Sequence, residues 1–124
     1  MNREELKIHN TSVIDAYKNA LAGIFYALKT QINIRKQLLI GVLAIIAGII
    51  LKINALEWIA LTFSITLVIF AEMVNTAVET TVDLITHKFS AKAKRAKDVA
   101  AGAVLITSLN AVIVGFILFL PKII

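Results

Sequence analysis

Four polar side chains recur along an otherwise apolar segment: Glu72, Asn75, Glu79 and Asp83. In an α-helix these positions share one stripe about 80° wide, because each residue turns the helix by about 100°. A carboxylate deep in a bilayer costs at least ~2.5 kcal/mol on insertion scales, so a row of them indicates a functional site. The stripe therefore predicts a site that faces a protein interior or the membrane interface.

Two plainer interpretations of the stripe stay open. In the first, the membrane-crossing segment ends near Ala71 and the acids lie on a water-exposed amphipathic continuation, an interpretation that applies above all to Asp83. In the second, Asn75 only forms a hydrogen bond between helices. Neither requires catalysis.

A basic segment follows from Ser90 to Leu105. Its cations, next to a helix N-terminus and to acidic residues, suit a nucleotide phosphate with its metal, because lysines offset phosphate charge and carboxylates supply oxygen ligands for Mg²⁺. Alternatively, Asp98 is an N-cap or first-turn acid and the lysines only set the membrane orientation. The sequence holds no glycine-rich phosphate loop and no HxxxH metal motif, which argues against a soluble kinase fold.

The composition indicates that lipid is one solvent of this chain. Of its 124 residues, 59% are hydrophobic and 17% are charged, and the mean hydropathy is +0.85. Soluble domains have ~45–50% apolar and ~25% charged residues. The absence of cysteine excludes disulfides and thiolate sites. The net charge of +5 fits attraction to anionic lipid better than binding of nucleic acid.

Four helical elements must position these residues, and together they predict an all-α integral membrane protein with a single domain over 1–124. Residues 13–31 form an amphipathic pattern too polar to span a bilayer, which predicts a helix on the membrane surface; packing on partner helices is the alternative. The apolar face of that helix combines aliphatic and aromatic side chains: Ala16, Tyr17, Ala20, Leu21, Ile24, Phe25 and Leu28. Residues 38–56, 58–85 and 99–120 are long and apolar enough to cross the membrane.

Lysines and arginines predict the orientation. Six precede the first span and five lie between the second and third, against only Lys52 and Lys122 on the opposite side. By the positive-inside rule, the N-terminus and the predicted 88–97 loop are cytoplasmic and the C-terminus lies outside. Three helices enclose a polar stripe poorly, so the stripe would face lipid in a monomer, which predicts a homo-oligomer.

Two motifs resemble those of the prokaryotic diacylglycerol kinase family, which includes the undecaprenol kinases. Residues 72–83, EMVNTAVETTVD, are similar to its signature E-x-x-N-[ST]-A-[IV]-E-x-x-[VI]-D. Residues 96–105, AKDVAAGAVL, resemble its second signature in the form typical of the undecaprenol branch. The resemblance covers nearly the whole chain. It implies a homotrimer in the bacterial inner membrane, with active sites shared between subunits at the cytoplasmic surface.

The resemblance also implies roles for particular residues. Glu72 matches the catalytic base, which contacts the lipid substrate and accepts the proton of its hydroxyl, and Asn75 matches a catalytic asparagine. Glu79 matches a ligand of the ATP-bound Mg²⁺. Lys97 and Asp98 match a nucleotide-contacting pair.

One further match and one departure lie near the start of the first span. Arg35 matches an arginine of the lipid-substrate region. Gln31 stands where the family has a second metal-binding glutamate, in the run Thr30–Arg35. A glutamine offers Mg²⁺ a neutral carbonyl oxygen and no charge.

These observations together predict an ATP- and Mg²⁺-dependent kinase that phosphorylates the hydroxyl of a membrane lipid, with undecaprenol preferred and diacylglycerol second. Phosphoryl transfer needs positioning, charge neutralisation and a base. Two alternatives remain. One is a pseudokinase or lipid-binding subunit that lost its metal through Gln31. The other is a small proton- or ion-conducting protein with Glu72 and Glu79 along its path.

Overall fold

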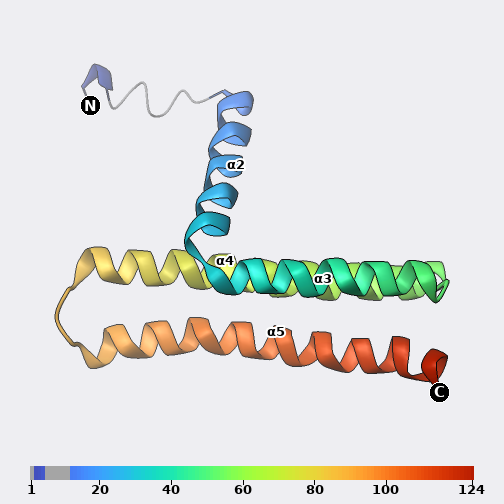
Figure 1. The fold of residues 1–124 in the computed structure, drawn as a ribbon. Coiled ribbons are helices and arrows are strands. Elements are labelled where there is room, and N and C mark those ends of the chain that lie inside the picture. Colours follow the sequence, from blue (N-terminus) through green and yellow to red (C-terminus); the bar gives the residue numbers. More distant parts are fainter. Residues whose placement is uncertain (1, 5–11) are drawn as a thin grey trace.

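The computed structural model describes residues 2–4 and 12–124, and from residue 12 onward the chain consists of helices and short connections. The part of the chain from residue 12 onward forms four helices: α2 (Val13–Thr30), α3 (Ile32–Ile50), α4 (Ala55–Ile85) and α5 (Ala91–Ile123). Helices α3, α4 and α5 lie side by side along one common axis, whereas α2 points away from them, across that axis (Figure 1). Helix α4 packs against both α3 and α5. The all-helical prediction is confirmed.

Three of these helices are long and apolar enough to cross a membrane. At 1.5 Å per residue, the 19 residues of α3 extend about 28 Å, close to the ~30 Å of a hydrocarbon layer. The 31 residues of α4 and the 33 of α5 extend about 46 Å and 50 Å. They therefore exceed the layer by about three and about four helical turns, respectively.

The turn between α3 and α4 lies inside the predicted 38–56 segment, whose helix ends at Ile50. The reason is a capping box: the Glu57 backbone N–H donates to Asn54 Oδ1, and the Asn54 N–H donates to Glu57 Oε2, both at 2.9 Å. This reciprocal pair begins α4 at Ala55, three residues before the predicted start. Lys52 has a φ of 52°, so a non-glycine residue takes the left-handed conformation in this turn.

The connection between α4 and α5 is shorter than predicted. A loop over 88–97 is wrong beyond Ser90, because the Ser90 side chain accepts from the Ala93 N–H at 3.4 Å and caps a helix that starts at Ala91. The alanines, lysines and arginine that follow are strong helix formers. Asp98 thus lies well inside α5 and is neither an N-cap nor a first-turn acid. Pro121 lies in the last turn of α5 without ending it.

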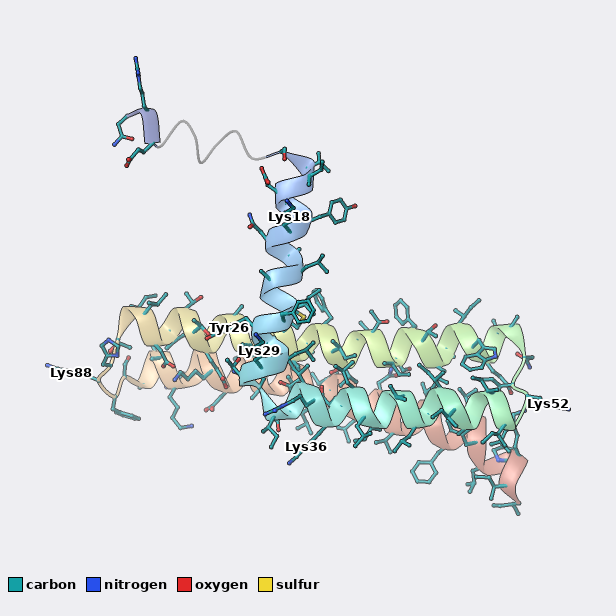
Figure 2. The ribbon with its side chains drawn as sticks, turned by 45° about the horizontal axis from the view of Figure 1, so that its top comes forward. Lys18, Tyr26, Lys29, Lys36, Lys52 and Lys88 are labelled. Carbon is teal, nitrogen blue, oxygen red and sulfur yellow. The ribbon has the colours of Figure 1, made fainter. Side chains whose placement is uncertain are left out.

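The interior of the bundle is small. Ile53, Leu61 and Leu118 form its buried cluster near the α3–α4 turn. Gly48 lies against the Trp58 ring, where an added Cβ would meet ring carbon Cη2 at 2.9 Å. Most other large apolar side chains are exposed, which suits helices surrounded by lipid or by further protein. Lys52 and Lys88 mark the two opposite ends of this bundle (Figure 2).

Ser12 caps the start of helix α2, and its Oγ accepts from the Asp15 N–H at 3.2 Å. The helix ends at Thr30, and the extended conformation of Gln31 (φ −110°, ψ 106°) turns the chain sharply into α3. Ala27 is the one buried residue of α2. The helix therefore projects from the bundle and contacts α3 and α4 only near its end, where Tyr26 and Lys29 lie (Figure 2).

Candidate active site

Glu72 is the buried member of the polar stripe, with 5% of its surface exposed. Gln37 of α3 donates from Nε2 to Glu72 Oε1 at 3.2 Å. The expectation that the stripe faces lipid in a monomer is therefore wrong for Glu72, because α3 of the same chain covers it. Gln37 itself was not among the predicted site residues; its only signal in the sequence is a polar side chain directly before an apolar run.

Asn75 and Glu79 form a second amide–carboxylate pair one turn further along α4. Asn75 Nδ2 donates to Glu79 Oε1 at 3.3 Å, and both residues are half-buried. The partner of Asn75 thus lies on its own helix and not on another one. In both pairs the amide carbonyl oxygen is buried from solvent and has no hydrogen-bond partner among the described residues; these oxygens are Gln37 Oε1 and Asn75 Oδ1.

Asp83, the last residue of the stripe, joins α4 to α5. Its Oδ1 lies 2.6 Å from Lys97 Nζ, and the side chains are 62% and 39% exposed. Lys97 precedes the uncharged segment 99–120, and its hydrogen bond with Asp83 raises the pKa of the ammonium, so Lys97 stays charged. Asp98, predicted to act with Lys97, lies 2.6 Å from Lys94 instead. Residues that are adjacent in the sequence are therefore in different ion pairs.

A cavity of about 400 Å³ opens beside the Asp83–Lys97 pair, where α4 ends and α5 begins. Lys88 and Lys94 add two more cations to its lining, and His87 and Phe89 flank Lys88 in the connection. Lysines around such a cavity suit the phosphates of a nucleotide, and an aromatic ring suits stacking against the purine or pyrimidine of that nucleotide. His87 and Phe89 were not predicted; their adjacency to Lys88 is the one signal the sequence carried.

Gln31 and Arg35 lie at the start of α3, away from that cavity's lining. Gln31 is half-buried and its Nε2 donates to Thr30 Oγ1 at 3.4 Å, while Arg35 is exposed. The described residues hold no group of three histidine, aspartate or glutamate side chains around one point. Mg²⁺ commonly takes one or two carboxylates plus substrate phosphates. Glu79, a single half-buried carboxylate, fits a metal that arrives with a nucleotide rather than one held by protein alone.

The fold and these side chains define a class: a small helical membrane protein with a buried carboxylate, a nearby half-buried one and a cation-lined cavity. Comparison with known proteins gives the family. The sequence model described as prokaryotic diacylglycerol kinase matches residues 18–119. The chain belongs to the prokaryotic diacylglycerol kinase family and is thus a member of a family of lipid kinases, which confirms the resemblance of its motifs.

Individual relatives carry both kinase names. A diacylglycerol kinase of Synechocystis sp. is 40% identical over 111 residues, which cover 89% of this chain and 63% of that protein. An undecaprenol kinase of Bacillus subtilis is 36% identical over 107 residues, covering 86% of this chain and 87% of the relative. A diacylglycerol kinase of Escherichia coli is 32% identical over 108 residues, covering 87% and 88%. The chain thus spans less than two thirds of the Synechocystis protein and most of the other two.

Proposed function

We propose that this chain is an ATP- and Mg²⁺-dependent kinase that transfers the γ-phosphate to the hydroxyl of a membrane lipid. The observation that carries the proposal is the position of the carboxylates along α4, in the part of the helix furthest from its start at Ala55. Counted from Ala55, about 20 residues cover a ~30 Å hydrocarbon layer. Glu72 then lies just inside the layer, where a lipid hydroxyl lies, and Glu79 and Asp83 lie beyond it, where a nucleotide has access.

The chemistry divides among these residues. Glu72 takes the proton of the lipid hydroxyl as that oxygen bonds to the γ-phosphorus, and the bond from γ-phosphorus to the bridging oxygen breaks to release ADP. Glu79 offers an oxygen to the Mg²⁺ that accompanies ATP; this ion, when bound, neutralises phosphate charge. Asn75 holds Glu79 through its hydrogen bond. Lys97 and its neighbour Asp98 contact the nucleotide, with Lys97 supplying positive charge.

The direction of α2, across the common axis of the bundle, supports a location for this helix. If α3, α4 and α5 cross the membrane, a helix that points across their axis lies along the membrane surface (Figure 1). Its aromatic residues would then lie among the headgroups, close to Arg35 and the lipid acceptor. We place the protein in the bacterial inner membrane, with the N-terminus and Lys88 cytoplasmic and the C-terminus outside.

Undecaprenol is the proposed acceptor, with diacylglycerol second. The form of residues 96–105, which resembles that of the undecaprenol branch, supports the polyprenol, and the relatives carry both kinase names. The test is ATP-dependent phosphorylation in mixed micelles with each lipid offered separately. Faster phosphate incorporation into diacylglycerol would reverse the preference, and no incorporation into either lipid would refute the kinase.

We further propose a homotrimer with shared sites. Because Glu72 is buried within one chain, the trimer is supported by the family resemblance and not by any need to shield that carboxylate. Gln31 is neutral where the family has a metal-binding glutamate, so a second candidate function is a lipid-binding pseudokinase. That alternative predicts lipid binding without phosphate transfer.

A further inference from the structure

The proposed base, Glu72, has two chemically distinct carboxylate oxygens in this structure. Oε1 accepts the hydrogen bond from Gln37 Nε2. Among residues 2–4 and 12–124 no group donates to Oε2, yet Oε2 is not one of the sealed side-chain atoms. One oxygen is therefore held by α3 and the other stays accessible.

Gln37 is well suited to hold a carboxylate that gains and loses a proton. Its amide donates an N–H to the ionised form. Its carbonyl Oε1 is sealed and unpartnered among the described residues, and a buried unpaired acceptor is costly. A proton taken up on Oε2 leaves Oε1 as the carbonyl oxygen of the acid, which still accepts the N–H of Gln37. The same side chain thus pairs with both states of the base.

Few charged groups compete with this contact. Glu79, about two turns along α4, interacts electrostatically with Glu72, and Lys97 of α5 interacts in turn with Glu79. Gln37 is the group of α3 that touches the Glu72 carboxylate, and it spans 35 positions of sequence. The orientation of Glu72 therefore depends on packing between α3 and α4.

We propose that Gln37 is the positioning residue of this kinase: it fixes Oε1 of Glu72 so that Oε2 points to the lipid hydroxyl. The proposal rests on the proposed role of Glu72 as base. It assigns Gln37 a function through Glu72, without contact to the reacting atoms. It also predicts that neither a leucine nor a glutamate replaces Gln37, since the first offers no hydrogen bond and the second adds a like charge.

The test combines kinetics with chemical labelling of the full-length protein in micelles. Gln37→Leu should lower kcat at least tenfold, leave KM for ATP within about twofold, and move the acid limb of the pH–activity profile up by about one unit. Gln37→Glu keeps the shape and should move the limb further in the same direction, because a second carboxylate opposes ionisation of the first. Asn33→Leu, an exposed amide on the same helix, is the matched control and should change none of these values.

A second readout does not depend on kinase activity. Carbodiimides react with protonated membrane carboxyls, so the pH range over which Glu72 is labelled by dicyclohexylcarbodiimide, located by peptide mass, follows its ionisation. In Gln37→Leu labelling should extend about one unit higher in pH, and Glu72→Gln should lose it. An unchanged labelling range and acid limb would overturn the positioning role even if kcat fell. Shifted labelling in a protein that phosphorylates no lipid would keep the Gln37–Glu72 coupling and refute the kinase instead.

Discussion

The ion pair between Asp83 and Lys97 should weaken nucleotide binding by a measurable amount. Lys97 Nζ lies 2.6 Å from Asp83 Oδ1, so Lys97 must leave Asp83, or share its protons, to contact a phosphate. Because the two side chains are 39% and 62% exposed, water and salt screen their attraction. Ion pairs of this exposure change an equilibrium by a factor of about 1.4 to 5. Removing the carboxylate should strengthen nucleotide binding by no more than that factor.

The perturbation is therefore Asp83→Asn, which keeps the shape and removes the charge. We expect KM for ATP to fall by a factor of about 1.4 to 5 at low ionic strength, with kcat within twofold of the natural protein. The difference should shrink as salt approaches ~1 M, where the screening length is ~3 Å. The assay is the initial rate of lipid phosphorylation against ATP concentration at several salt concentrations.

Two further variants make this reasoning refutable. In a Lys97→Met background, Asp83→Asn should have no effect on KM, because the competition it relieves is gone. Lys122→Met, which breaks the 3.4 Å pair with Glu57 at the opposite end of the bundle, is the control and should leave KM unchanged. A raised KM in Asp83→Asn, or an equal effect with and without Lys97, would show that Asp83 aids nucleotide binding directly.

Four further predictions follow from the proposed site and topology. Glu72→Gln should lower turnover 10²–10⁴-fold while ATP binding persists, and turnover like that of the natural protein would remove Glu72 as the base. A cysteine at Ser90 should resist impermeant thiol reagents in intact cells while one at Lys122 reacts; the reverse pattern contradicts the orientation. Chains with Glu72→Gln mixed with chains carrying Glu79→Gln should regain some activity if subunits share sites, and a fully active monomer would exclude the trimer. Gln31→Glu should lower the Mg²⁺ concentration needed for half-maximal activity, whereas superimposable titrations would mean that position 31 does not bind metal.

Hydropathy, periodicity and motif spacing determine much of this protein because they act within single helices. The 3.6-residue period is enough to place Glu72, Asn75 and Glu79 on one side of α4, and long apolar runs are enough to predict three helices able to cross a membrane. The family signature in residues 72–83 is likewise contiguous. The ends of the helices were harder to predict from the sequence. The capping box at Asn54 and the cap at Ser90 decide where α4 and α5 begin, and hydropathy does not show these positions.

Tertiary structure alone decided which groups of different helices meet. Lys97 lies next to Asp98 in the chain but pairs with Asp83, because neighbouring residues on a helix point about 100° apart while α4 and α5 face each other. Gln37 reaches Glu72 from 35 residues away, and its contact depends on how α3 packs against α4. The packing of two helices depends on the combined fit of many side chains, so it cannot be predicted from a local sequence pattern. The carboxylates of this site can thus be predicted from the sequence, whereas the partners that reach Glu72 and Asp83 from other helices are properties of the fold.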